Sequence, residues 1–236
     1  MPASRRKGFL NRLGAFFEVL VVALSGSILT QVGLTMAGIP VIQVLTTTRY
    51  LFIFLISEAT ITLLLILILL RLRGEDFRKI GWDWRHAGRE ALTGVLAIPI
   101  LFGATLGVSI FFRYWLPQYV STTNPLLDLI ETPQDLALFL ISSIYVGGFK
   151  EEVQRAFVLV RFNQYLGGLA AGLILWSIFF AVGHNIQGVD NAVGAGVLGF
   201  LFGLLFIWRR KLIAPMLAHA AFDLLTLVYV WTVLKA

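Results

Sequence analysis

The stretch GGFKEEVQRAFVLVRF, residues 147–162, places two adjacent glutamates, a lysine and two arginines in the middle of a very apolar chain. It follows the apolar segment ISSIYV and comes shortly before the apolar run GGLAAGLILW. An ionisable side chain at the centre of a membrane costs at least about 2.5 kcal/mol on insertion scales. Each ionisable residue of this stretch is therefore a candidate for a functional role.

The composition indicates a membrane protein. Of 236 residues, 58% are hydrophobic and only 14% are charged, and the mean hydropathy is +0.85. The net charge is +6, but the basic residues cluster at the ends of apolar runs, as membrane orientation requires, and form no patch for a nucleic-acid partner. Because the chain has no cysteine, disulfides and thiolate chemistry are excluded.

Apolar runs of about 20 residues are long enough to cross a bilayer as helices. They predict an all-α, polytopic membrane protein of about seven transmembrane helices (six to eight) around an intramembrane polar cavity. We expect one integral-membrane domain over residues 1–236, with a motif-bearing core at about 135–236. The polar segment 71–90 is expected to form a short helix on the membrane surface. The predicted spans are 14–32, 50–70, 91–112, 136–160, 169–184, 193–208 and 212–234.

Lysine and arginine residues gather in every second connection, which predicts a cytoplasmic N-terminus and an outer C-terminus. The alternate connections hold only Arg49 and Arg113 at their margins. We place the chain in the bacterial inner (cytoplasmic) membrane, with the lipid bilayer as its solvent. The basic residues that carry this prediction are Arg5, Arg6, Lys7, Arg12, Arg71, Arg73, Arg78, Lys79, Arg85, Arg89, Arg161, Arg209, Arg210 and Lys211.

Two glutamates stand alone on their spans, and two form a pair. We expect Glu18 and Glu58 to lie near the interface or to bond a neighbouring span. On a helix, Glu151 and Arg155 are i,i+4 neighbours and can pair, so a structural reading of the cluster is that it neutralises itself. Glu152 points about 100° away from that pair, which leaves it without an explanation as a structural residue.

Two of the three histidines lie in apolar spans with polar or aromatic residues at helical spacing. His184 comes four residues after Phe180, and His219 comes four residues before Asp223, so the members of each pair share a helix face. The third histidine, His86, belongs to the polar segment and is expected to be structural.

Glutamates and histidines that converge inside a membrane cavity provide what hydrolysis requires. A carboxylate can act as general base on water, and a histidine can orient that water or donate to a developing oxyanion. Alternatively, Glu151, His184 and His219 could hold zinc and use its bound water. The spacing is not the H-E-x-x-H pattern, and the residues alone leave both alternatives open.

Three motifs in this order resemble the CPBP family of intramembrane proteases, which includes CAAX prenyl endopeptidases and bacteriocin-processing or Abi-type immunity proteins. They are EEVQR (151–155), FAVGH (180–184) and HAAFD (219–223). The resemblance implies cleavage of a membrane-associated peptide or protein near its C-terminus, a sorting anchor or a leader. It further implies that Glu151 and His184 activate water and that His219 and Asp223 stabilise the oxyanion. Glu152, Arg155 and Phe180 complete the motifs, and the glutamate-type mechanism, without a metal, is favoured.

The first motif departs from the family pattern E-E-x-x-x-R because Arg155 comes one residue early. If the glutamates are aligned, Glu151 is the base; if the arginine is aligned, Lys150 takes the first place and Glu151 becomes the second, arginine-paired glutamate. The latter register predicts an inactive enzyme, and we prefer the former. Asp223 also stands where many members have asparagine, and an aspartate donates a hydrogen bond only when it is protonated.

Counting about 1.5 Å per residue from the basic ends puts His219 and Glu151 roughly 12 and 15 Å deep but His184 roughly 24 Å deep. Straight spans would keep His184 apart unless its helix begins later or the segment HNIQGVDN folds inward. Two other functions remain open. One is a non-catalytic immunity or partner-binding member of the same family. The other is a small transporter in which Glu58, Glu151 and His219 form a relay.

Overall fold

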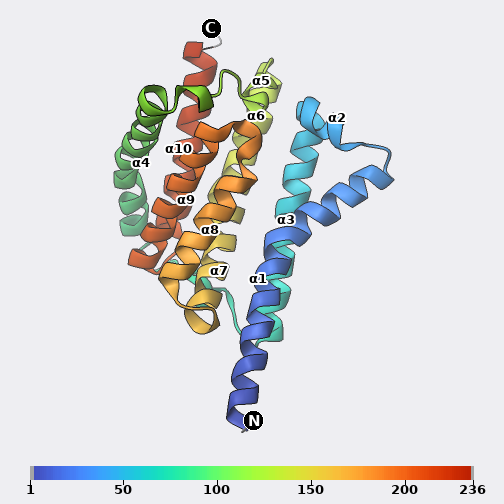
Figure 1. Cartoon of the computed structure of the whole chain (residues 1–236), viewed down its shortest axis with the longest axis vertical. Coiled ribbons are helices and arrows are strands. Elements are labelled where there is room, and N and C mark those ends of the chain that lie inside the picture. The colour runs from blue at the N-terminus through green and yellow to red at the C-terminus, as the bar shows by residue number, and fades with distance from the viewer. Residues whose placement is uncertain (1–2, 235–236) are drawn as a thin grey trace.

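A computed structural model describes residues 3–234, and its regular structure over that range is entirely helical (Figure 1). Side chains are described for residues 8–233, so those of Arg5, Arg6 and Lys7, which contribute to the predicted orientation, lie outside the described part. The α-helices are α1 Ala3–Met36, α2 Val41–Thr46, α3 Thr48–Leu72, α4 Ala87–Trp115, α5 Pro125–Asp128, α6 Pro133–Ser142, α7 Glu152–Tyr165, α8 Leu169–Gly183, α9 Val189–Arg209 and α10 Ile213–Tyr229. The 3-10 helices are η1 Phe77–Ile80, η2 Pro117–Tyr119 and η4 Asn185–Gln187, and the π-helices are η3 Ser143–Glu151 and η5 Val230–Leu234.

Each of the seven predicted spans falls on helix, which confirms the all-α membrane fold. Among the described residues, five helical segments are long and apolar enough to cross a membrane: Gly8–Met36, Thr48–Leu72, Ala87–Trp115, Val189–Arg209 and Ile213–Val233. The predicted fifth span is the shorter apolar helix α8. The predicted fourth span is built from α6, η3 and α7, which follow one another without a break.

Helix α7 lies at the centre of the bundle and is covered on all sides. Every residue from Glu152 to Leu159 is buried, and α7 packs against α1, α3, α8 and α9. A helix that is buried all round needs apolar side chains on every face, and the run AFVLV (156–160) provides them. The glutamates and Arg155 at the start of this helix are therefore deep inside the protein.

Helices α8 and α9 lie side by side because glycines let them approach closely (Figure 1). A Cβ at Gly199 would lie 3.1 Å from the Phe180 ring, and one at Gly203 would overlap Leu173. Small residues at such contacts are typical of helix packing in membranes. The close approach brings the Phe180 ring, from the second sequence motif, onto the backbone of α9.

Helix α6 begins at a capping box. The Thr132 hydroxyl accepts from the Asp135 backbone N–H at 3.2 Å, and Asp135 accepts from the Thr132 backbone N–H at 2.9 Å. Pro133 at the first helical position strengthens this start. The hydrogen bond from the Thr132 hydroxyl also holds the pKa of the Asp135 carboxyl below its usual value.

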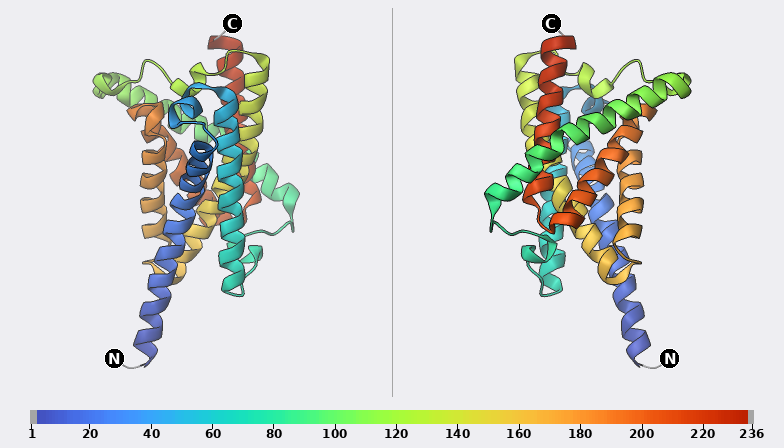
Figure 2. Two further views of the ribbon diagram at one scale, coloured as in Figure 1. Left: turned by 90° about the vertical axis from the view of Figure 1, so that its right-hand side faces the viewer. Right: turned by 90° about the vertical axis from the view of Figure 1, so that its left-hand side faces the viewer.

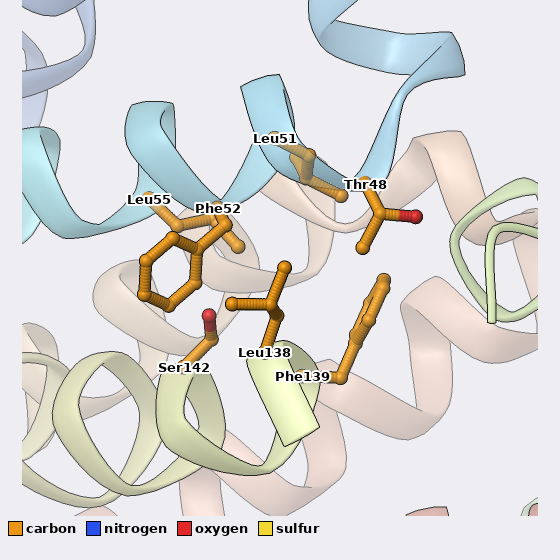
Figure 3. A pocket seen from close by; sticks show the side chains of 7 residues that line it. All are labelled: Thr48, Leu51, Phe52, Leu55, Leu138, Phe139 and Ser142. Atoms are coloured by element: carbon orange, nitrogen blue, oxygen red, sulfur yellow. The ribbon is translucent and has the colours of Figure 1, made fainter. Parts of the chain in front are cut away.

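Helix α6 packs against α3. Leu51, Phe52 and Leu55 of α3 face Leu138 of α6 across a shallow pocket, which Thr48, Phe139 and Ser142 complete (Figure 3). The lining is almost entirely apolar. This packing fixes the direction in which the chain enters the π-helix η3.

The polar segment between α3 and α4 forms less helix than expected. It contains only the four-residue 3-10 helix η1, between Gly74 and Gly81, whose φ angles of 68° and 89° end regular helix on either side. Trp82 packs on Phe149 with ring centroids 5.8 Å apart, whereas Trp84 is exposed. Of the expected short helix only this single turn is present, and its position on the membrane surface stays a prediction.

The two ends of the chain lie at opposite ends of the long axis (Figure 2). This arrangement agrees with an odd number of crossings. The predicted side of each end, with the N-terminus cytoplasmic, stays a prediction.

Candidate active site

The glutamate pair lies at the point where the π-helix η3 passes into α7. Glu151 is the last residue of η3, and Glu152 is the first of α7. Short π-helical turns inside helices occur frequently at functional sites. A Cβ at Gly148 would lie 2.6 Å from the Cβ of Ala220, so the glycine lets η3 approach α10 closely. The first and third motifs meet across this contact.

His219 is held by Glu152. The ring donates from Nδ1 to Glu152 Oε1 over 2.7 Å, and the Glu152 side chain is only 1% exposed. Arg155 donates to the same carboxylate oxygen from one turn further along α7. A buried carboxylate requires such compensation, because an unpaired charge in a low-dielectric interior is very unfavourable.

The other nitrogen of His219 faces two more carboxylates. Its Nε2 is 3.6 Å from Asp223 Oδ2 and 3.8 Å from Glu151 Oε2, both beyond hydrogen-bond distance. The Glu151 and Asp223 side chains are 16% and 30% exposed, so this side of the ring is the open one. A Cβ at Gly147 would lie 3.3 Å from Nε2 and 2.6 Å from Asp223 Oδ2, so the glycine leaves room there.

A series of ring contacts, which includes the Arg155 guanidinium, connects His219 to His184. The ring of His219 stacks on Phe202 at 4.3 Å between centroids. Arg155 lies 5.5 Å from the Phe202 ring and 5.1 Å from the Phe180 ring. The Phe180 ring in turn lies 4.3 Å from that of His184. The phenylalanine of the F-x-x-x-H motif is thus a spacer between His184 and Arg155.

The structure does not bring His184 to Glu151, as the resemblance implied. His184 shares a hydrogen bond of 2.8 Å with the Phe180 carbonyl, and within the described residues it forms no ion pair with a carboxylate. The segment HNIQGVDN does not fold inward either. It forms η4 at the end of the bundle, where Asp190 accepts from the backbone N–H of Ser121. The physical reason is depth, since His184 directly follows the C-terminal end of the 15-residue helix α8.

Arg155 pairs with Glu152 and not with Glu151, so the possible i,i+4 pair does not form. Residues i and i+3 are also neighbours on a helix. The arginine bonds the glutamate that is fully buried, whereas the partly exposed Glu151 faces the His219 ring at 3.8 Å. Glu152 therefore occupies the arginine-paired second place, in agreement with the register that aligns the glutamates. Lys150 is bonded elsewhere, to Glu58.

The expected bonds of Glu18 and Glu58 to neighbouring spans are confirmed. Glu18 accepts from Arg73 at 2.5 Å and from Arg161 at 2.6 Å. Glu58 lies 2.8 Å from the Lys150 Nζ. Both carboxylates join helices that are distant in the sequence.

Two contributors to the site were missed by sequence reasoning. Phe202 is one of several similar residues in the run GFLFGLLF, and nothing in that run distinguishes it. Gly147 belongs to a visible Gly-Gly pair directly before the charged stretch, and this signal could have indicated a close helix contact.

The residues named for zinc do not assemble into a metal site. Among the described residues, no group of three or more histidine, cysteine, aspartate or glutamate side chains is arranged to hold a metal ion. Glu151 and His219 are near each other, but His184 lies beyond Phe180. We therefore derive no step through a metal.

Residues 132–225 match the sequence model of a family described as type II CAAX prenyl endopeptidase, Rce1-like. The match begins at the N-cap of α6 and ends just after Asp223 in α10, so it contains all three motifs. Over these residues the chain matches the family that the three motifs predict. No curated protein and no solved structure matches the chain.

Proposed function

Residues 132–225 belong to the Rce1-like family of type II CAAX prenyl endopeptidases, and from this premise we propose that the chain is a glutamate-type intramembrane endopeptidase. It hydrolyses a peptide bond of a membrane-associated protein or peptide. One observation carries the mechanism: a fully buried glutamate fixes one nitrogen of His219, while the other nitrogen faces two partly exposed carboxylates.

Glu151 is the general base in this proposal. It removes a proton from a water molecule, and the resulting hydroxide attacks the carbonyl carbon of the scissile peptide bond. The protonated His219 ring donates from Nε2 to the carbonyl oxygen as negative charge develops there. When the C–N bond breaks, Glu151 returns the proton to the leaving nitrogen, so that all atoms and charges balance.

Glu152 and Arg155 keep the His219 ring in place. The hydrogen bond to Nδ1 fixes which nitrogen faces the open side, and Arg155 compensates the buried charge of Glu152. This is the task that an orienting carboxylate performs for a catalytic histidine.

Asp223 lies on the open side of the ring, beside the nitrogen that donates to the carbonyl oxygen in this proposal. Its Oδ2 is 3.6 Å from Nε2 and shares that nitrogen's surroundings with Glu151. As an ionised carboxylate it accepts hydrogen bonds and does not donate them. An oxyanion contact from Asp223 itself therefore requires its protonated form.

Cleavage assays in proteoliposomes test the proposal. A farnesylated peptide with a C-terminal CAAX sequence is the first probe, because the family's description names prenylated CAAX substrates. A leader peptide and a transmembrane sorting anchor are the second and third. Glu151→Gln and His219→Ala are each expected to lower kcat by about 10²-fold to 10⁴-fold, the usual contribution of a general acid or base. Wild-type rates in Glu151→Gln would contradict the assignment of the base.

Two further measurements sharpen the assay. Activity is expected to survive exhaustive chelation, and loss that zinc restores would contradict the glutamate type. His184→Ala is expected to cost less than Glu151→Gln, because His184 bonds the Phe180 carbonyl and, among the described residues, forms no ion pair with a carboxylate. An equal loss would mean that His184 reaches the reacting atoms, as the resemblance implied.

A protein inactive on all three probes, with an in vivo effect that survives every one of these variants, would be a non-catalytic member.

A further inference from the structure

A buried ion pair lies next to the proposed base, on the side away from His219. Lys150 Nζ is 2.8 Å from Glu58 Oε1, and the two side chains are only 9% and 8% exposed. Lys150 directly precedes Glu151 in η3, whereas Glu58 is in the middle of α3. The mechanism proposed above uses neither residue.

Three elements meet at this pair. The Thr62 hydroxyl donates to Glu58 Oε1 over 3.1 Å, within α3. On α1, a Cβ at Gly26 would overlap the Thr62 hydroxyl and lie 3.2 Å from Glu58 Oε1. The glycine therefore lets α1 cover the pair, and the carboxylate is held by more than its lysine.

Net stability is a poor reason for such a pair. Transferring two charges into a membrane interior is unfavourable, and well-packed apolar side chains often serve as well or better. An ion pair has, however, a strict geometric requirement that an apolar contact lacks. It sets the position of one helix relative to another.

We propose that Glu58 and Lys150 are positioning residues that fix the rotation of η3 and thereby hold Glu151 beside Nε2 of His219. Neighbouring residues on a helix project in different directions. With Lys150 anchored on α3, Glu151 is directed toward α10, where His219 lies 3.8 Å away. The other polar tie between η3 and α3, Tyr145 to Thr60 at 3.1 Å, is exposed and is the weaker anchor.

The proposal rests on the proposed function but is tested without it. The chain has three histidines, so selective ¹⁵N labelling of histidine gives ring signals that single substitutions can assign. In Glu151→Gln, the His219 Nε2 signal should shift because the neighbouring charge is lost. Glu58→Gln and Lys150→Met should shift the same signal in the same direction, since Glu151 then moves away.

Glu90→Gln is the matched control. Glu90 forms an ion pair of 2.6 Å with Arg209 between α4 and α9, with side chains 3% and 17% exposed. It resembles Glu58 in burial and charge but does not touch η3. The His219 signal should stay unchanged in this variant even if the protein is less stable.

Two double variants keep the proposal testable if a single variant does not fold. Glu58→Leu with Lys150→Leu removes both charges, is expected to fold, and should still shift the His219 signal. Glu58→Lys with Lys150→Glu exchanges the partners and should restore at least part of the original signal. An unchanged signal in Glu58→Gln, or in the double leucine variant where Glu58→Gln does not fold, would overturn the proposal.

A cleavage assay distinguishes a failure of this inference from a failure of the proposed function. If the chain cleaves peptides, Glu58→Gln should lower kcat by about 10²-fold with little change in KM, as expected when a catalytic group is misplaced by about 1 Å. If wild-type protein cleaves none of the probes while the histidine signals still respond as described, the proposed function fails and the positioning role stands.

Discussion

Helix α7 carries two buried arginines, Arg155 and Arg161, and their surroundings differ in one decisive respect. Arg161 is fully buried and lies 2.6 Å from Glu18 Oε2, 2.7 Å from Glu75 Oε2 and 3.0 Å from Gln164 Oε1. The second oxygen of Glu18 accepts from Arg73 at 2.5 Å. Here a carboxylate and a guanidinium meet at direct contact, and α1, α3 and α7 are joined.

Around Arg155 only some of the charged groups are in direct contact with one another. Arg155 and His219 both bond Glu152, but the far side of the His219 ring faces two carboxylates that no group bonds. Within the described residues, Glu151 and Asp223 have no hydrogen-bond partner, and both are partly exposed. The cluster is therefore buried and hydrogen-bonded on the Nδ1 side of His219 and partly exposed on the Nε2 side.

The comparison teaches how to separate structural from reactive charges in a membrane protein. Charges that directly contact their counter-charges stabilise a helix contact, and a substrate would have to displace those contacts. Charges that lack partners on an accessible side can bind water or a peptide without breaking anything. Burial alone does not distinguish the two, since both arginines are almost completely buried.

Glu152→Gln should give the largest effect, on activity. A glutamine keeps the size of the side chain but loses the charge that Arg155 and His219 share, so the ring is no longer held in one orientation. We expect kcat on the farnesylated probe to fall by up to about 10⁴-fold, the loss seen when a catalytic histidine loses the charge of its orienting carboxylate. The measurement is kcat in proteoliposomes, corrected for the folded fraction from a thermal melt.

Glu18→Gln should give the opposite result, a loss of stability with kcat nearly unchanged. The substitution leaves two guanidinium groups, one of them fully buried, without their shared charge. Breaking a buried pair in this way costs about 3–5 kcal/mol. The free energy of unfolding in detergent measures this loss. A kcat that falls as far as in Glu152→Gln would mean that the two clusters are not functionally distinct.

Much of this arrangement was predictable from the sequence. The apolar runs correctly predict helix at all seven expected segments, because the length of an apolar run is visible in the sequence and can be compared with the thickness of a membrane. The order of EEVQR, FAVGH and HAAFD predicts the family. The solitary carboxylate Glu18 bonds a neighbouring span, as the cost of an unpaired charge in a membrane requires.

The details of the site were not predictable, for physical reasons. A π-helix depends on hydrogen bonds between residues i and i+5, which no residue pattern specifies, so the geometry at Glu151 is not evident from spacing. The choice of Glu152 over Glu151 by Arg155 depends on which side chain α10 covers. His184 shows the same limit, because equal spacing within a motif does not give equal depth in the bundle.

The neighbouring glycines Gly147 and Gly148 allow the smallest and most selective test of the open side. Neither has a positive φ, so alanine fits the backbone at both, and in a helix it is intrinsically favourable. Gly148→Ala should push η3 away from α10, because its Cβ would lie 2.6 Å from the Ala220 Cβ and 3.2 Å from the Met216 carbonyl. We expect it to lower the free energy of unfolding by about 1–3 kcal/mol, as overpacking usually does.

Gly147→Ala should instead leave stability almost unchanged and lower kcat. Its Cβ would lie nearest to Asp223 Oδ2, at 2.6 Å, and to His219 Nε2, at 3.3 Å, and the partly exposed Asp223 side chain can turn away. The methyl group would then occupy the space beside Nε2 that a peptide carbonyl must enter. A misplaced substrate is expected to cost about 10²-fold in kcat. If Gly147→Ala is as active as wild type, the open side of His219 is not where the substrate binds, and the contrast between the two arginine clusters would concern stability alone.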